Sequence, residues 1–296
     1  MRPARGWARG RTYSEPRVHS VQRAPQQRPQ YSQGPREMSQ RDQYYRNDQY
    51  GQRGKEQSPQ WNQNYDAEYG IFADNDDRRN FISRVYLILS VAISFCALVV
   101  FLTSYYEESR EFLNDYWWLY IVFMIGFMII YIAFACVKSL RRNSPTNWIL
   151  FTIMVVLLAA STSVFASLYS LKVISFAFIT TASITILITI IARFIPVDFT
   201  KCGTLLCILS IVFLVISIVV TILIIVLRMP ILQVGLAGLG VLLISFWMLF
   251  DTQRILGGKY ELEEDEYLMG AITLFVDIIY IFQYLLIIFG LCASDE

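Results

Sequence analysis

The sequence predicts an all-α integral membrane protein: a seven-helix transmembrane bundle preceded by a disordered cytosolic tail. Two observations lead to this fold class. First, 55% of the 296 residues are hydrophobic and only 17% are charged, whereas about a quarter of the residues in a soluble domain are charged. Second, a polar, basic segment ends near residue 78 and long apolar runs follow it. These features exclude a wholly disordered or fibrous protein and argue against a soluble enzyme.

The predicted tail covers residues 1–77. Residues 1–60 hold twelve Lys and Arg against five Asp and Glu, and six of the nine prolines. A segment so rich in Gln, Arg, Pro, Tyr and Ser cannot bury enough apolar surface to offset its chain entropy, so we expect disorder. Its three isolated Arg-Gly pairs are too few to indicate RNA binding, and we predict no nucleic-acid partner. A basic tail beside a membrane more simply contacts anionic lipid.

Seven apolar runs fill the second predicted domain, residues 78–296. Each is close to the roughly 20 residues that a spanning helix needs, and lipid forces the backbone to satisfy its hydrogen bonds within a helix. The predicted helices cover about residues 81–103, 116–137, 147–169, 173–195, 203–227, 231–253 and 268–291. Because only residues 169–172 separate the third run from the fourth, we expect these two helices to form a tight antiparallel pair.

The charges of the loops predict the orientation. With the residues before the first helix included, ten Lys and Arg lie on the side of the even-numbered loops and three on the other side. Positive residues stay in the cytoplasm, so the N-terminus is predicted to be cytosolic. Seven complete spans then place the C-terminus on the opposite side. A last run that dips into the membrane and returns would place it in the cytosol instead.

Asp251 and Asp277 are the two charged residues that a position at a helix end does not easily explain. Asp277 lies about 14 Å into the seventh run, where a charge costs about 2.5–3.5 kcal/mol. Thr273, Tyr280 and Tyr284 share its helix face at steps of three and four. Such a polar stripe faces a protein interior or a water-filled path, so these residues are candidates for lining a pore.

We expect Asp251 and Asp277 to meet, because a short loop joins their helices. Two carboxylates in a poorly hydrated site cannot both ionise cheaply, so they would titrate as a coupled pair. The pair is a candidate pH sensor or gate, or a cation site without a fixed structural metal. In the simpler alternative, each aspartate bonds to a neighbouring helix or pairs with a basic residue. The candidate basic partners are Arg84, Arg193 and Arg254, of which Arg84 is also a candidate supporting residue of the pore.

The loop before the seventh helix is strongly acidic. Its carboxylates belong to Glu261, Glu263, Glu264, Asp265 and Glu266. They are candidates for gathering cations at a cytoplasmic mouth, although a run of charge is more often a solvated loop. The membrane part of the sequence has no histidine, no glycine-rich phosphate loop and no metal-ligand spacing. We therefore predict that the protein is not an enzyme and holds no cofactor.

Several short motifs resemble the transmembrane Bax-inhibitor-motif family. The motifs are Arg84-Val85-Tyr86, Val197-Asp198-Phe199-Thr200, Asp251-Thr252-Gln253 and Asp277-Ile278-Ile279-Tyr280-Ile281-Phe282. The Pro/Gln/Tyr-rich tail and the pair Arg141-Arg142 before Pro145 resemble the Lifeguard branch, which includes glutamate-receptor-associated proteins. The resemblance covers about residues 78–291.

The resemblance implies a bundle with the seventh helix central. It implies a pH-sensitive calcium leak of intracellular membranes, the endoplasmic reticulum or the Golgi, that regulates calcium homeostasis and restrains apoptosis; the plasma membrane is a further possible location. The family's paired aspartate sensor falls on Asp251 and Asp277 here, and the resemblance implies calcium as the permeant ion, which would lie near these two residues only transiently. The implied partners are the lipid bilayer, calcium ions and apoptosis-regulating membrane proteins.

Three other functions compete with this interpretation. The main alternative is a non-conducting membrane adaptor that inhibits death signalling through protein partners; in that case tail deletions abolish activity and aspartate changes do not. An intramembrane aspartyl protease would need Tyr-Asp and Gly-x-Gly-Asp, but Phe250 and Val276 precede the two aspartates here. A G-protein-coupled receptor would have its N-terminus outside, against the charge count.

Overall fold

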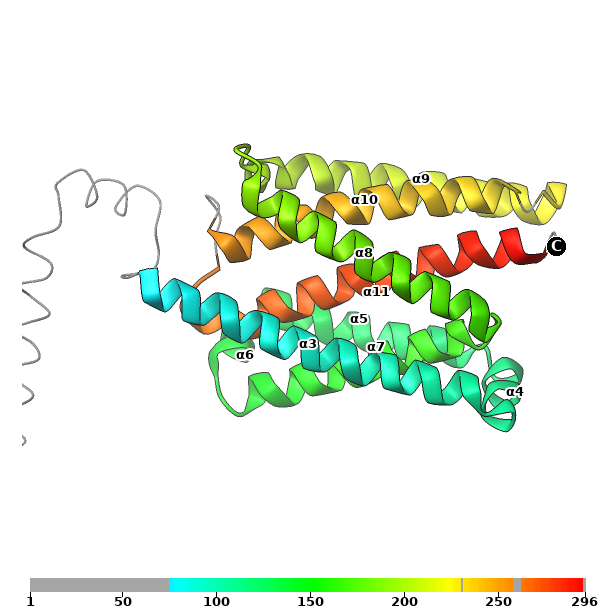
Figure 1. The fold of residues 1–296 in the computed structure, drawn as a ribbon, viewed down its shortest axis with the longest axis horizontal. Coiled ribbons are helices and arrows are strands. Elements are labelled where there is room, and N and C mark those ends of the chain that lie inside the picture. Colours follow the sequence, from blue (N-terminus) through cyan, green and yellow to red (C-terminus); the bar gives the residue numbers. More distant parts are fainter. Residues whose placement is uncertain (1–74, 230, 258–261, 295–296) are drawn as a thin grey trace, which may run out of the picture. The chain divides into compact units, whose positions relative to one another are not determined.

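The computed structural model of the chain describes residues 75–229, 231–257 and 262–294 (Figure 1). All the regular elements in this part are helical. They are α3 (Asn75–Tyr105), α4 (Glu107–Asp115), α5 (Leu119–Cys136), α6 (Lys138–Arg142), α7 (Thr146–Ala166), α8 (Leu171–Phe194), η1 (Phe199–Cys202), α9 (Gly203–Leu227), α10 (Ile231–Leu256), η2 (Glu264–Glu266) and α11 (Tyr267–Ser294). The predicted tail, residues 1–77, lies almost entirely outside the described residues.

Seven of these helices are long and apolar enough to cross a membrane, namely α3, α5 and α7 to α11. Each covers most of one predicted run, which confirms the all-α fold of seven spans. The largest boundary difference is at α3, which begins six residues early. α5 begins three residues late because residues 116–118 form a turn, and the ends of α7, α10 and α11 also differ by three residues from the prediction. The last run is one unbroken helix, so the described C-terminal end lies at the opposite end of the bundle from the start of α3 (Figure 1).

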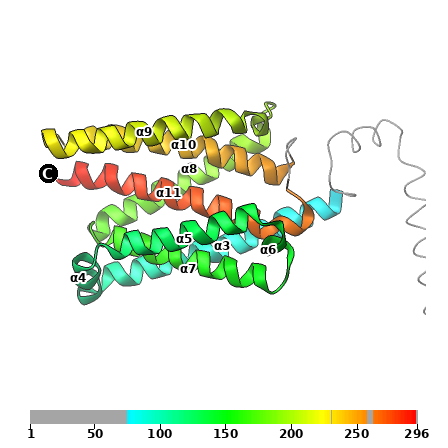
Figure 2. The same ribbon diagram turned by 180° about the vertical axis from the view of Figure 1, so that it is seen from behind.

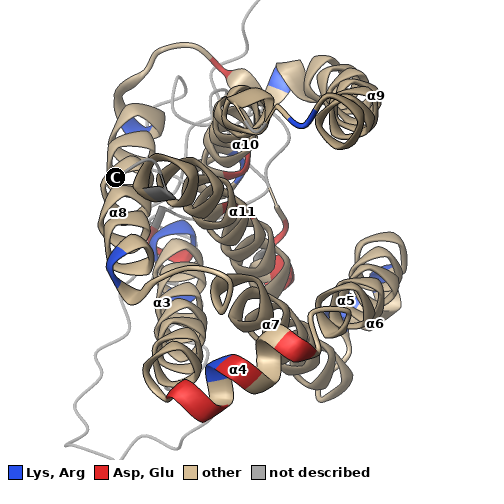
Figure 3. Cartoon of the chain, turned by 90° about the vertical axis from the view of Figure 1, so that its right-hand side faces the viewer, with Lys and Arg blue, Asp and Glu red and all other residues tan. Residues whose placement is uncertain are grey.

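The central helix of the bundle is α11, as the family resemblance implied. It packs against α3, α7, α8 and α10, and the end view in Figure 3 shows it enclosed by them. Of the residues in its apolar window, 67% are buried inside the protein, against none for α9. The side chains that α11 buries most fully include Ala271, Ile272, Phe275, Ile281 and Leu286.

The outer spans of the bundle are α5 and α9. α5 packs on α7, and α9 packs mainly on α10, where the indole Nε1 of Trp247 donates a 2.8 Å hydrogen bond to the hydroxyl of Ser210. Most of the side chains along α9 are apolar and exposed. In a bilayer that surface contacts lipid. Lipid offers no hydrogen-bond partners, so the backbone hydrogen bonds must be formed within the helix.

The predicted tight pairing of the third and fourth helices is wrong. α7 packs on α3, α5 and α11, whereas α8 packs on α10 and α11. The turn that joins them rests on the central helix, because the ring of Tyr169 fills the space beside Gly290 of α11. The short connection therefore fixes the directions of the two helices and not their contact, since both bury apolar side chains against α11.

Four short helices connect the spans, and the sequence pattern predicted none of them. α4 lies at one end of the bundle and α6 at the other (Figure 2). η1 and η2 also lie at the end that holds α6, because each follows or precedes a span that terminates there. This end holds the loops that the charge count predicts to be cytoplasmic.

Candidate functional site

Helices α10 and α11 bring Asp251 and Asp277 together. Asp251 lies five residues before the end of α10, and Asp277 lies ten residues into α11. Both side chains are buried, each residue being 7% exposed. Their carboxylates lie close enough to interact electrostatically. The structure thus places the two predicted sensor residues in one site, although their role stays a prediction.

The two carboxylates have different surroundings. The Arg254 guanidinium donates a hydrogen bond of 3.2 Å from Nη1 to Asp251 Oδ1. Arg254 also lies over the ring of Phe250, 5.7 Å from its centroid, a distance at which a cation is attracted to an aromatic face. By contrast, Oδ2 of Asp277 is buried and has no hydrogen-bond partner among the described residues. Asp251 therefore has a cationic partner and Asp277 has an oxygen left open.

Polar side chains continue from the aspartates along one face of α11. Thr273 lies beside the Asp251 carboxylate, and its hydroxyl donates to the carbonyl of Gly270 at 3.2 Å. On the other side of Asp277, Tyr280 and Tyr284 lie near each other and near Tyr120 of α5. Within the predicted polar stripe Thr273 and Asp277 are buried, whereas Tyr280 and Tyr284 are half-buried.

Sequence reasoning missed Tyr131 of α5. This tyrosine lies within electrostatic range of both aspartates, Arg254 and Tyr280, and its ring stacks on Phe127 with the centroids 5.5 Å apart. The signal was present in the sequence as a tyrosine hydroxyl in the middle of a largely apolar run. Nothing in that run showed that α5 would reach the face of α11 that bears Asp277.

A second polar group lies further along α11, toward the end that holds α4. Gln283 Nε2 donates to the hydroxyl of Thr162 on α7 at 3.2 Å, and its Oε1 accepts from the hydroxyl of Tyr120 at 3.4 Å. Gln283 is buried, so these bonds offset the cost of placing an amide inside the bundle. Sequence reasoning also passed over Gln283, although a glutamine in a spanning run is itself a signal.

Arg84 does not join the aspartates. It is exposed on α3, and Arg254 is the basic residue that the structure places at Asp251. Of the three basic residues named in the alternative interpretation, Arg193 lies elsewhere, in the wall of a cavity near the end of α8. No described contact between Arg84 and the two aspartates supports the role predicted for Arg84, and that role stays a prediction.

The acidic loop before α11 faces basic side chains of α6. The guanidinium of Arg142 pairs with Glu263 and, at 3.2 Å, with Asp265, while Arg141 Nη2 lies 3.1 Å from Glu266 Oε1. Glu261 and the side chain of Glu264 lie outside the described residues. A cation that gathered at this loop would compete with two arginines, and its cation-gathering role stays a prediction.

The site can hold and exchange protons, or bind a cation weakly, because two carboxylates and the Thr273 and Tyr131 hydroxyls surround it. Among residues 75–229, 231–257 and 262–294 no group of three or more His, Cys, Asp or Glu side chains is placed to hold a metal ion. Such a pair lacks the six to eight oxygen ligands of a stable calcium site. We therefore expect calcium to bind at this pair only weakly and for a short time.

The chain is similar to known membrane proteins over most of the described bundle. The family model described as inhibitor of apoptosis-promoting Bax1 matches residues 78–294. Among curated proteins, Protein lifeguard 3 of Mus musculus is 32% identical over 222 residues, which cover 75% of this chain and 72% of the relative. The Homo sapiens protein of the same name is also 32% identical, over 75% and 71%. Protein lifeguard 4 of Mus musculus is 27% identical, over 71% and 84%.

Proposed function

Because the chain belongs to the Bax-inhibitor family, in its Lifeguard branch, we propose that it is a pH-sensitive calcium leak of intracellular membranes that restrains apoptosis. The fold and the family establish a multi-pass membrane protein of a group named for inhibiting apoptosis. The calcium leak, its pH dependence and its location in the endoplasmic reticulum or the Golgi are our proposal.

The buried pair Asp251 and Asp277 carries this proposal. Buried carboxylates without full compensation are costly in a membrane and generally mark an ion or proton pathway. Here the two lie on adjacent helices, near one end of the bundle, and one of their oxygens is unpartnered. An arrangement built only for stability would be expected to satisfy that oxygen, because an open buried acceptor costs about 1–3 kcal/mol.

In the proposed mechanism, Asp251 and Asp277 share a proton and hold α11 against α10. A change in pH alters the number of protons on the pair, and the charge repulsion or hydrogen bond between the two helices changes with it. The polar face of α11, with Tyr280 and Tyr284, then provides the path along which a hydrated calcium ion passes.

We place the N-terminus and the end of the bundle that holds α6 in the cytosol. Arg141 and Arg142 of α6 and Arg193 and Lys201 near η1 lie at this end, in agreement with the rule that basic loops stay cytoplasmic. The aspartate pair is then closer to the cytosolic face than to the lumen, so it would respond chiefly to cytosolic pH.

The decisive experiment is calcium efflux from liposomes that hold the purified protein, measured between about pH 5 and pH 8, a range that brackets physiological pH. We expect a pH-dependent leak whose profile is flattened or displaced in Asp277→Asn and in Asp251→Asn. The matched control is Asp115→Asn, a carboxylate exposed at the end of α4, which should leave the profile unchanged.

If liposomes with folded wild-type protein release calcium no faster than protein-free liposomes, the proposed channel function is wrong. The function would then be that of a non-conducting adaptor that acts on death signalling through protein partners. In that case deletion of the basic N-terminal segment, rather than substitution of the aspartates, should abolish protection of cells from apoptosis.

A further inference from the structure

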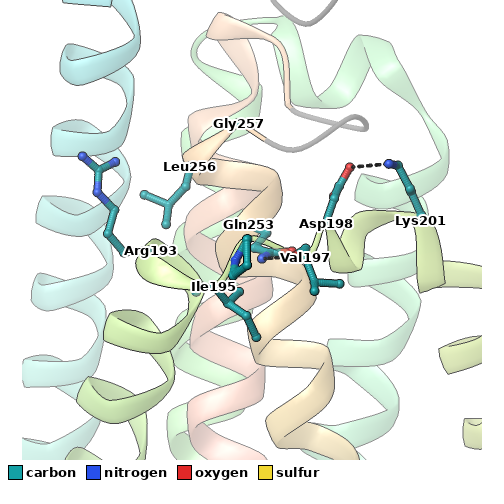
Figure 4. A pocket seen from close by; sticks show the side chains of 10 residues that line it. Arg193, Ile195, Val197, Asp198, Lys201, Gln253, Leu256 and Gly257 are labelled. Carbon is teal, nitrogen blue, oxygen red and sulfur yellow. Dashed lines mark hydrogen bonds and ion pairs between the residues drawn. The ribbon is translucent and has the colours of Figure 1, made fainter.

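A cavity opens at the end of the bundle where α8 and α10 terminate. Its volume is about 350 Å³, and its walls are the last turn of α8, the turn of residues 195–198, η1 and the last turn of α10 (Figure 4). The cavity is separate from the aspartate pair, whose residues do not line it. Two of the motifs that carried the family resemblance contribute lining residues, namely Val197 and Asp198 from one and Gln253 from the other.

Gln253 fixes the shape of this cavity. Its side chain is buried, with Nε2 donating to the carbonyl of Val197 at 2.9 Å and Oε1 accepting from the backbone N–H of Phe199 at 2.6 Å. Asp198 Oδ1 in turn accepts from the backbone N–H and hydroxyl of Thr200, at 3.1 and 2.5 Å. The connection between α8 and α9 is thus held firmly against α10, and the cavity is a preformed feature.

The charge around the cavity is predominantly positive. Arg193 and Lys201 line it on opposite sides in Figure 4, and Lys201 Nζ lies 3.7 Å from Asp198 Oδ2. Among the described residues that line the cavity, two are basic, Arg193 and Lys201, and one is acidic, Asp198. The excess of one positive charge favours an anion.

The cavity lies at the depth of lipid headgroups. The apolar spans of α8 and α10 terminate at Phe194 and Leu256; Leu256 lines the cavity, and Phe194 directly follows the lining residue Arg193. Phe194 is 80% exposed and Val197 is 54% exposed, and exposed apolar side chains at the end of a span face the acyl region. A ligand in this cavity would therefore have its polar part among Arg193 and Lys201 and an apolar part beside Phe194.

We propose that this cavity binds the phosphate of an anionic phospholipid headgroup, with Arg193 and Lys201 as its ligands. Guanidinium and ammonium groups are the usual protein ligands of phosphate, and basic pockets between spanning helices suit lipid headgroups. The carboxylate of Asp198 holds Lys201 at the rim. The volume of about 350 Å³ suits a headgroup, while the acyl chains would lie outside along Phe194 and Val197.

The proposal can be tested by lipid binding to the full-length protein in detergent. The probe is a short-chain phosphatidylinositol phosphate, with short-chain phosphatidylcholine and inorganic phosphate as comparison ligands, and bound ligand is counted by native mass spectrometry. We expect wild type to retain the anionic lipid in preference to phosphatidylcholine. Arg193→Gln with Lys201→Gln should raise the Kd about thirtyfold, since each nearby basic residue contributes about a factor of five.

The matched control is Arg79→Gln, an exposed basic residue at the same end of the bundle, which should leave the Kd unchanged. An equal loss of lipid affinity in this control and in the double variant would show that the lipid is attracted to the basic surface as a whole. That result would overturn the proposal that the cavity binds it. If inorganic phosphate binds as tightly as the lipid, the lipid proposal is overturned and the ligand of the cavity is a soluble phosphate compound. Should the double variant fail to fold, the single variant Arg193→Gln, at an exposed position, should still raise the Kd about fivefold, and an unchanged Kd there would equally overturn the proposal.

Discussion

Gly240 of α10 lies directly against the ring of Tyr284 on α11. A β-carbon at position 240 would be 2.7 Å from Cζ of that ring, which is closer than van der Waals contact allows. The missing side chain therefore lets α10 and α11 approach each other and holds Tyr284 on the polar face. Two nearby glycines of α10, Gly235 and Gly238, have no such neighbour within 4 Å. The structure thus distinguishes one packing glycine among three that look alike in the sequence.

Gly240→Ala should destabilise the bundle, because the ring of Tyr284 would have to move in a packed interface. Overpacking of this kind costs about 1–3 kcal/mol. Gly238→Ala is the matched control and should be neutral or slightly stabilising, since alanine favours helix over glycine. Thermal unfolding of the purified protein in detergent gives both values. Equal midpoints for the two variants would contradict the close approach at Gly240.

Glu266→Gln should also lower the unfolding temperature. The side chains of Arg141 and Glu266 are only 13% and 9% exposed, and removing one partner of a largely buried pair leaves the other charge uncompensated, at a cost on the order of 3 kcal/mol. The control is Asp76→Asn, which breaks the exposed pair of Asp76 with Arg79. An exposed pair contributes about 1 kcal/mol or less, so the control should unfold close to wild type. A loss in Glu266→Gln no larger than in the control would argue against the buried pair.

Arg254→Gln should move the pH profile of the proposed calcium leak toward higher pH. The positive charge of Arg254 beside Asp251 favours the carboxylate over the protonated acid. Without that charge the aspartate pair keeps its shared proton to a higher pH, and the change in leak follows the proton. Efflux from liposomes across the same pH range measures the shift, with Arg79→Gln as control. An unchanged profile would remove Arg254 from the mechanism, and a shift toward lower pH would contradict this electrostatic effect.

Tyr131→Phe should alter the same pH profile while leaving the fold intact. Phenylalanine keeps the ring that stacks on Phe127 and removes only the hydroxyl that lies near both aspartates. Tyr105→Phe, at an exposed tyrosine at the end of α3, is the control. The measurement combines thermal unfolding, which should match wild type for both variants, with calcium efflux. An unchanged profile in Tyr131→Phe would limit the site to α10 and α11.

The spans and the aspartate pair could be predicted from sequence because the membrane constrains both strongly. Lipid requires long apolar helices, so seven apolar runs became seven spans. The same cost of charge in lipid singled out Asp251 and Asp277, and the short loop between their helices made them neighbours. These predictions needed only local sequence and the properties of the solvent.

The partners of these residues could not be predicted, because they depend on how the helices are arranged around α11. Arg254 was one of three possible cations for the pair, and spacing alone did not rank them. Tyr131 reaches the site from α5, a helix whose position no sequence pattern gave. The acidic loop looked solvated, and only the fold showed that Glu266 meets Arg141 on α6. The tight pairing expected for α7 and α8 failed for the same reason.

The peripheral position of α9 has a mechanical consequence. This helix packs mainly on α10 and continues from η1, and a mismatch between its apolar length and the bilayer thickness is accommodated in part by tilting. Thinning or stretching the membrane would change the tilt of α9 relative to its end at η1. This change would act through η1 on the turn that is hydrogen-bonded to Gln253. Gln253 lies two residues from Asp251 on α10. Membrane tension would in this way reach the helix that bears the aspartate pair without any ligand.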